Sequence, residues 1–436
     1  MTFKYKAAVA VAGLWSVTAL SGGLAYGAEP LSREEAIARA LEAAPILEAL
    51  QENITAANAG ILQAGVKPNP QIGADIENFT GTGPFSELGR TELTVHYAQK
   101  YERGGKRDLR TRLAREDKKI SIAEWHIRRL EVVRRVEAAY VAASAAKARL
   151  KNQHQQVAIF EQIEATIKKR VAAGRDPDLA AQNAYVRLLG AQGRADAAQL
   201  ALEAAKLSLA SLWQGAPDSF EIEGTRFGIL PNAMTARTPD MVLEGPDLVL
   251  WQRKQERSKA SLALEKARAV QDPTFKVGLR YHQNTSDVAA VAGISIPLAI
   301  HDTNRGNISR AKANVNRSRF EMMDVERQLG RQLMIAHAAQ VGSFKQARLL
   351  ERNLAAALEA KSLVMNRLDR GVASYLDVFA AQALAAEIEE QRIDALARFH
   401  SAQVTINRLT TKYDNDALLP SEASDASGNA TAREGY

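Results

Sequence analysis

Two alternating segments, PNPQIGADIENFTG at residues 68–81 and TELTVHYAQKYERGGKR at residues 91–107, decide how this chain folds. Apolar residues occupy every second position of each segment: Ile72, Ala74, Ile76, Leu93, Val95 and Tyr97. This period of two is typical of β-strands with one apolar face and one polar face. A Gly-rich turn separates the segments, so the sequence predicts a hairpin with strands over about 70–80 and 91–101.

A long helix is predicted directly after this hairpin. Residues 106–173 contain neither Pro nor Gly, and Gly174 is a typical helix C-cap. At 1.5 Å per residue such a helix spans roughly 100 Å, close to the combined length of the two shorter helices that flank it in the sequence. The sequence therefore predicts an antiparallel helical rod in which each long helix is matched by two short ones.

The second half of the chain repeats the same order of parts. Strand patterns cover about 273–283 and 288–299, a helical run covers 307–370, and Gly371 ends it. The chain is thus an internal duplication of one structural unit. A C-terminal segment rich in Ser, Ala, Asp and Gly follows the second repeat. We expect a signal peptide at 1–27, a first repeat at 28–213, a connector at 214–245, a second repeat at 246–412 and a disordered tail at 413–436.

The first residues have the pattern of a secretory leader. Lys4 and Lys6 precede an apolar run over 7–20, and small residues follow at 25–28, where we expect cleavage. No other stretch approaches the ~20 apolar residues that a membrane-spanning helix needs. If the mature chain spans a membrane, a barrel is therefore the structure that remains.

Composition argues against several classes of function. The chain has no cysteine, which excludes disulfides, thiolate metal sites and thiol nucleophiles. Its formal net charge of +7 comes from basic residues interleaved with acidic ones along helices, so nucleic-acid binding is not expected. We find no phosphate-binding loop, nucleophile elbow or paired-His zinc motif, and expect no catalytic residue, no cofactor and no bound metal.

Three residues near the end of the first long helix recur at identical spacing near the end of the second: Arg170, Gly174 and Leu179 against Arg367, Gly371 and Leu376. Asp377 and Val378 follow directly, and the motifs Pro68-Asn69-Pro70 and Gly104-Gly105-Lys106-Arg107 flank the first hairpin. With these residues the chain resembles the outer-membrane efflux family, channel proteins similar to TolC, from Leu31 to about Lys412. The motifs around the hairpin resemble its heavy-metal (cobalt-zinc-cadmium) branch.

The resemblance implies a mostly α fold with a small transmembrane β part. Three chains would form a twelve-stranded β-barrel in the outer membrane, continued by a long α-helical barrel in the periplasm. The strand count supports a homotrimer independently, because four strands cannot close a barrel and eight leave an interior filled by side chains. The family further implies a passive exit duct whose partners are a periplasmic adaptor and an inner-membrane RND-type transporter, with divalent heavy-metal cations as the expected substrate.

The resemblance also assigns roles to residues at the helix ends. The two tips, Arg170, Gly174 and Leu179 with Arg367, Gly371 and Leu376, would dock the adaptor. Three copies of Asp377 near one axis would form a cation-favouring pore aperture. The alternative for Asp377 is a first-turn residue that stabilises the return helix through its dipole, and both interpretations stay open. The position in the first repeat that matches Asp377 is Ala180.

Four polar strand residues are candidates for lining the lumen: His96, Lys276, Arg280 and His282. As metal contacts the two histidines are weak candidates, because one imidazole per strand makes no closed site. Val277 and Ile294 are expected to face lipid.

Three other functions remain as alternatives. The first is a soluble periplasmic coiled-coil adaptor or scaffold, which shares the long helices but gives no reason for four alternating segments of membrane-spanning length. The second is an outer-membrane duct for organic compounds or drugs, and the third is a secreted enzyme, which the missing catalytic motifs disfavour.

Overall fold

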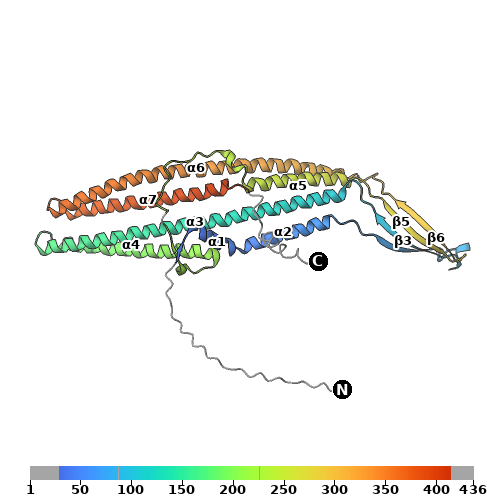
Figure 1. Ribbon diagram of the computed structural model, residues 1–436, viewed down its shortest axis with the longest axis horizontal. Coiled ribbons are helices and arrows are strands. Elements are labelled where there is room, and N and C mark those ends of the chain that lie inside the picture. Colours follow the sequence, from blue (N-terminus) through green and yellow to red (C-terminus); the bar gives the residue numbers. More distant parts are fainter. Residues whose placement is uncertain (1–28, 87, 225, 414–436) are drawn as a thin grey trace, which may run out of the picture.

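The computed structural model describes residues 29–86, 88–224 and 226–413, which form an elongated molecule. Two helical hairpins lie at one end and a four-stranded sheet lies at the other (Figure 1). The expected signal peptide and the tail after Tyr413 lie outside the described residues. Within the described part of the chain, no helix is both long and apolar enough to cross a membrane.

The helices are α1 (Arg33–Glu42), α2 (Pro45–Ala64), α3 (Lys106–Ala172), α4 (Asp178–Ala210), α5 (Pro246–Arg268), α6 (Arg305–Asp369) and α7 (Tyr375–Thr410). The strands are β1 (Glu29–Leu31), β2 (Gln71–Glu77), β3 (Glu92–Lys100), β4 (Phe220–Ile222), β5 (Thr274–His282) and β6 (Asp287–Ser295). β2 stops before Asn78, whose backbone is left-handed with φ at 57°. β6 stops short of Pro297, which has no N–H for a strand ladder.

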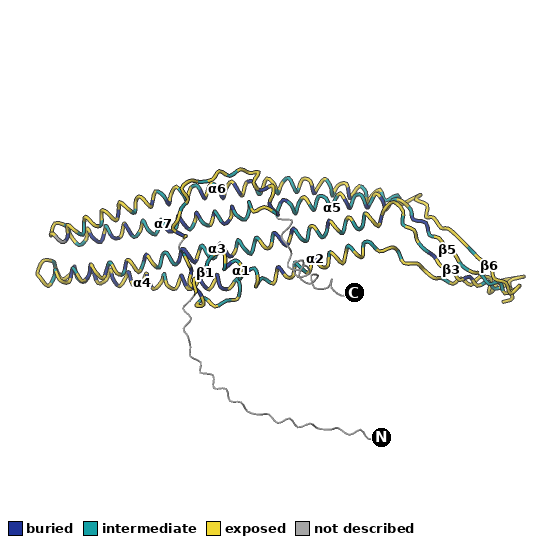
Figure 2. Tube along the Cα trace, viewed as in Figure 1, coloured by how far each residue is buried: buried dark blue, intermediate teal, exposed yellow. Residues whose placement is uncertain are grey.

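The two long helices each pack against shorter partners. α3 contacts α4 towards the tips and α2 and α5 towards the sheet, while α6 contacts α7 and α5. Contacts between α3 and α7 join the two hairpins. Buried positions recur along the helices (Figure 2). Many of these buried residues are alanines, whose small side chains let the helix axes approach closely.

A compact hydrophobic cluster ties the two helix tips together. Phe160 and Ile167 of α3, Leu368 of α6 and Phe379 of α7 pack in it, and α4 contributes alanines. Burying one such large side chain stabilises the fold by about 1.5 to 3 kcal/mol. The tips are therefore one packed unit within each chain rather than two separate ends.

The connector between the repeats folds back on the start of the described chain. β4 pairs in parallel with β1, and Leu31, Phe220 and Ile222 are buried against α1 and α3. This strand pair was not predicted from the sequence. Tyr413, the first residue of the expected tail, packs its ring 4.8 Å from that of His126 and donates its N–H to the Glu244 carbonyl at 2.8 Å.

The four long strands form one antiparallel sheet in the order β2-β3-β5-β6. The central pair, β3 and β5, joins the two repeats, with Glu92 opposite His282 at one end and Lys100 opposite Thr274 at the other. The outer strands, β2 and β6, form the two edges of the sheet.

Candidate functional site

One face of the sheet gathers the polar residues of all four strands. The register places Glu77, Glu92, His282 and Asp287 in one row across the sheet. Asp75, Thr94 and Arg280 occupy the next polar row, and His96 and Lys276 lie in the rows after it. All four candidate lumen residues therefore share this polar face.

Arg280 connects three strands across the polar face. Its guanidinium lies 2.8 Å from Glu77 and 2.9 Å from Glu92, and its Nε donates to the Thr94 hydroxyl at 2.9 Å. The single positive charge of Arg280 lies between the two carboxylates and offsets their mutual repulsion. The alternation in the sequence predicts Arg280 on this face, but its partners could not be predicted because they become neighbours only through the register.

His96 is paired with a glycine on each neighbouring strand, Gly73 of β2 and Gly278 of β5. A Cβ at Gly73 would approach its imidazole Cε1 to 2.7 Å, and a Cβ at Gly278 would come 2.8 Å from its Cα. The imidazole Nδ1 is 3.3 Å from the Asp75 carboxylate. Gly73 thus makes room for the partly buried imidazole, and Gly278 lets the β5 backbone lie close to the β3 backbone beside it.

The two histidines do not come together. Nδ1 of His282 lies 3.5 Å from Glu92, in a different row from His96. Within the described residues, no group of three or more His, Asp or Glu side chains is arranged to hold a metal ion. Each histidine lies instead beside a single carboxylate, that of Asp75 or that of Glu92.

The opposite face of the sheet is apolar and open. Ile72 is 82% exposed, and Val277 and Ile294 are 57% and 59% exposed. Large apolar side chains are exposed on all four strands. A contiguous exposed apolar surface usually marks contact with a membrane or with another protein.

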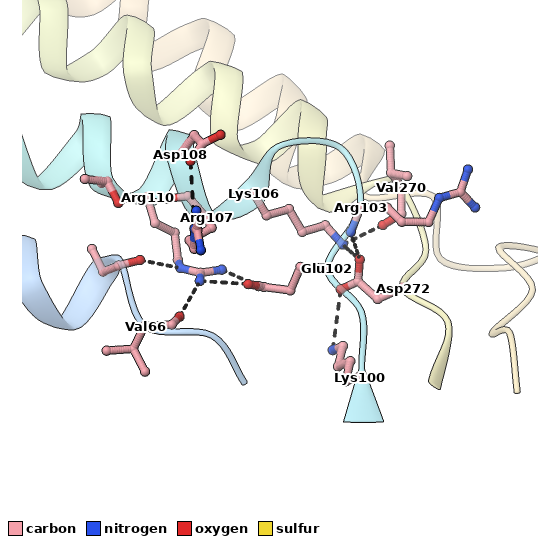
Figure 3. A network of polar contacts seen from close by, with 12 residues as sticks. Val66, Lys100, Glu102, Arg103, Lys106, Arg107, Asp108, Arg110, Val270 and Asp272 are labelled. Carbon is pink, nitrogen blue, oxygen red and sulfur yellow. Dashed lines mark hydrogen bonds and ion pairs between the residues drawn. The ribbon is translucent and has the colours of Figure 1, made fainter. Parts of the chain in front are cut away.

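A polar network stands where the sheet meets the helices (Figure 3). Lys106, the first residue of α3, donates to the Asp272 carboxylate at 2.7 Å and to the Val270 carbonyl at 2.6 Å. The backbone N–H of Arg103 donates to the same carboxylate at 2.9 Å. Burial alone would raise the pKa of Asp272, but the hydrogen bonds from Lys106 and Arg103 outweigh it and hold the pKa below its usual value.

This network joins the two repeats. Asp272 and Val270 lie between α5 and β5 of the second repeat, whereas Lys106 begins the long helix of the first. On the other side of the network Arg110 forms an ion pair with Glu102 and donates to the Val66 carbonyl at 3.2 Å (Figure 3). In the sequence Lys106 stands out only as part of a motif, and no local pattern indicates Asp272.

The first helix tip is closed by an arginine. Gly174 has a left-handed φ of 67° and ends the helix. The Arg170 guanidinium binds both Asp176 oxygens, at 2.6 and 3.2 Å, and donates to the Leu368 carbonyl of the second tip at 3.1 Å. The hydrogen bond from Arg170 holds the pKa of Asp176 below its usual value.

The second tip is closed by a capping box. Gly371 has a φ of 75°, and the Ser374 hydroxyl accepts the Leu376 N–H at 3.0 Å. The Asp377 carboxylate accepts the Ser374 N–H at 2.9 Å, so this side chain caps α7. Arg367 is exposed, as are Leu179 and Leu376 of the two tips.

Comparison with known proteins gives consistent matches over most of the chain. The family model described as outer membrane efflux protein matches residues 36–215 and 246–411. The cobalt-zinc-cadmium resistance protein CzcC of Cupriavidus metallidurans is 25% identical over 384 residues, which cover 88% of this chain and 90% of CzcC. The nickel and cobalt resistance protein CnrC of the same organism is 24% identical over 320 residues, or 72% of this chain and 75% of CnrC.

A solved structure has the same fold. The outer membrane protein VceC of Vibrio cholerae superposes with a TM-score of 0.68 at 17% sequence identity, over 88% of this chain and 97% of VceC.

Proposed function

Because this chain belongs to the outer membrane efflux protein family, we propose that it is the outer-membrane channel of a tripartite efflux pump. It is a passive exit duct. An inner-membrane RND-type transporter supplies the energy, and a periplasmic adaptor joins that transporter to the duct. The chain performs no catalysis in this role.

The two-faced sheet carries this proposal. Its apolar face meets the outer-membrane lipid, and its polar face, with His96, Lys276, Arg280 and His282, lines a water-filled lumen. Four strands per chain give twelve in a homotrimer, which is enough for a barrel with an open interior. A soluble adaptor or scaffold would have to leave the apolar face in water, which disfavours that alternative.

The helical hairpins extend the duct into the periplasm and dock the adaptor at their tips. Leu179 and Leu376 are exposed and offer apolar contacts. Gly174 and Gly371 shape the turns, Arg170 braces the first tip, and Arg367 remains exposed at the second. Three copies of Asp377 surround the aperture while each also caps its own helix.

We further propose that the substrates are divalent heavy-metal cations. The relatives CzcC and CnrC are named for resistance to cobalt, zinc, cadmium and nickel. The polar face also suits cations, because its four carboxylates (Asp75, Glu77, Glu92 and Asp287) outnumber its three basic side chains (Lys100, Lys276 and Arg280). The paired charges let hydrated ions pass without holding them.

A deletion strain tests both parts of the proposal. Its growth in cobalt, zinc, cadmium and nickel salts is compared with its growth in a panel of organic toxicants, with and without the complementing gene. Metal sensitivity alone supports the metal duct, whereas sensitivity to organic compounds alone favours the drug-duct alternative. Recovery of the protein in the soluble periplasmic fraction after carbonate extraction would contradict the channel itself.

A further inference from the structure

We infer the register in which neighbouring copies of this chain pair through the edges of their sheets. Gly293 of β6 lies opposite Asp75 of β2 in the next copy, and Val291 lies opposite Glu77. The inference rests on the proposed trimer and adds to it the residues that meet at each junction between copies.

The two edges need partners that the chain cannot supply to itself. β2 and β6 lie at opposite sides of the sheet, three strand spacings apart, or about 14 Å. Edge strands offer their outward N–H and C=O groups to another strand. Side chains on the apolar faces of both edges are open, and Ile72 and Ile294 are examples. A second copy of the chain presents the complementary edge.

Two hydrogen bonds show which backbone groups point outward. Tyr101 donates its N–H to the Pro273 carbonyl at 2.8 Å, and Gln283 donates to the Thr91 carbonyl at 3.0 Å. In an antiparallel ladder such pairs alternate, so odd-numbered residues of β3 and β5 bond to each other and even-numbered ones bond to the outer strands. Even-numbered residues of β2 and β6 therefore point outward: Ile72, Ala74, Ile76, Val288, Ala290, Ala292 and Ile294.

The same alternation limits the allowed registers. The even-numbered residues of both edge strands are also the apolar ones, so even must pair with even for lipid-facing side chains to stay on one face. A slip of one residue would exchange the two faces and is excluded. Pro297, which follows β6, is odd-numbered, so its missing N–H does not interrupt the outer edge. The registers that are still allowed between β6 and β2 of the next copy differ from one another by two residues.

The internal duplication selects one of them. Pro70 directly precedes β2 and Pro273 directly precedes β5, so Gln71 corresponds to Thr274. Gln71 pairs with Ala98, and Thr274 pairs with Ser295. Ala98 of β3 therefore corresponds to Ser295 of β6.

The central pairing of the sheet can now be transferred to the junction between copies. Ala98 pairs with Lys276 of β5, and Lys276 corresponds to Gly73 by the same proline alignment. Ser295 should thus lie opposite Gly73 of the next copy. Two residues further along, Gly293 meets Asp75, and Val291 meets Glu77. Both are non-hydrogen-bonded pairs, in which side chains approach most closely.

Cysteine crosslinking tests this register directly, because the chain has no cysteine of its own. Asp75→Cys, Glu77→Cys, Val291→Cys and Gly293→Cys are combined in pairs and oxidised with copper phenanthroline in isolated outer membranes. The matched pairs, 293 with 75 and 291 with 77, should give a covalent, reductant-sensitive trimer. The crossed pairs, 293 with 77 and 291 with 75, use the same four substitutions and should react about tenfold more slowly, since diagonal neighbours lie near the limit of disulfide reach.

The outcomes separate the register from the proposed function. Faster crosslinking of either crossed pair overturns the register, although a trimer exists. Intact trimers on native gels with no crosslink from any pair overturn the edge pairing. Absence of trimers from the outer membrane, for the unsubstituted chain, overturns the pairing together with the channel. If the polar-face variants fail to assemble, Ala74→Cys with Ile294→Cys tests the same register from the apolar face, and its failure to crosslink counts against it.

Discussion

The two helix tips have the same three residues at the same spacing but use them differently. In the first tip Arg170 is tied to Asp176 and reaches across to the Leu368 carbonyl of the second. In the second tip Arg367 is exposed, and Asp377 closes the turn through a capping box. The first tip thus supports the second through Arg170, although the matching residues in their sequences suggest that the two tips are equivalent.

The strands show the opposite behaviour. Both hairpins keep the same alternation, so that Val95 in the first repeat and Val277 in the second lie on one apolar face. The two repeats therefore use corresponding residues in the same way in the strands but not in the helix tips. The apolar residues of both repeats share one face of the sheet, whereas the two tips contact each other through different side chains.

The largest expected effect tests the equality of the strands. Val95→Arg and Val277→Arg each place a charge on the proposed lipid-facing surface and should cost about 2 to 4 kcal/mol near the midplane. Lys276→Arg keeps its charge on the polar face and should assemble normally. Trimer yield in outer-membrane fractions measures the effect. Equal yields for all three variants would contradict the face assignment, and a loss confined to one repeat would contradict the equality of the two.

The next largest effect tests whether the matching arginines of the two tips contribute differently to stability. Arg170→Ala leaves the Asp176 carboxylate and the Leu368 carbonyl without this donor and should destabilise the tips by about 2 kcal/mol. Arg367→Ala, at the exposed equivalent position, should change stability by less than about 0.5 kcal/mol. Hydrogen exchange of tip amides in purified trimers gives both values. Similar protection in the two variants would show that the tips are equivalent after all.

The pH dependence of the same tip provides a second readout. The pKa of Asp176 is lower in the folded chain than its usual value, so its ion pair stabilises the tip above about pH 4 and this contribution is lost as the pH falls through the folded pKa. Tip protection in the parent chain should therefore weaken in acid. Arg170→Ala should lack this acid-dependent step, and a step of unchanged size would exclude the ion pair as its cause.

A smaller effect of about 1 to 2 kcal/mol is expected at the two turn glycines. Gly174 and Gly371 have left-handed φ values, and a Cβ at either would meet open space, so Val at either position suffers backbone strain alone. Asn accepts this conformation better and serves as the control at both positions. The melting temperature and the yield of adaptor crosslinking should fall for Gly371→Val and change little for Gly371→Asn. Unchanged crosslinking in both would remove the second tip from the docking surface.

Much of this fold follows from local sequence. The helices were predictable because long runs lack Pro and Gly, and the strand faces because their period of two is regular. The family resemblance drawn from the tip motifs is confirmed by the family model, which matches residues 36–215 and 246–411. By contrast, β1 and β4 span three residues each, too few to display a period.

The contacts between repeats could not be predicted. Lys106 and Asp272 are 166 residues apart in sequence, and nothing local indicates that they meet. Arg280 binds Glu77 and Glu92 only because the register brings β2, β3 and β5 into line. Arg367 and Arg170 occupy the same position of the repeated tip motif, so the sequence does not distinguish them. Only the packing of the tips leaves Arg367 exposed and brings Arg170 into contact with Asp176.

The smallest effect on stability is expected at Asp377, where the two tips differ in charge. The matching position in the first tip is Ala180, which is buried, whereas Asp377 is exposed at the start of α7. Asp178, exposed at the start of α4, provides a matched control, because it places a carboxylate at the same end of the other hairpin.

Asp377→Asn keeps an oxygen that can accept the Ser374 N–H and removes the negative charge from the helix start, at a cost of about 0.3 to 1 kcal/mol. If three Asp377 carboxylates surround the aperture, reconstituted channels of this variant should lose cation selectivity and block by divalent ions, since the charge that attracts cations is gone. Asp178→Asn should keep both properties. A reversal potential and a divalent block equal to those of the parent would mean that Asp377 serves only as a helix cap and that the constriction lies elsewhere.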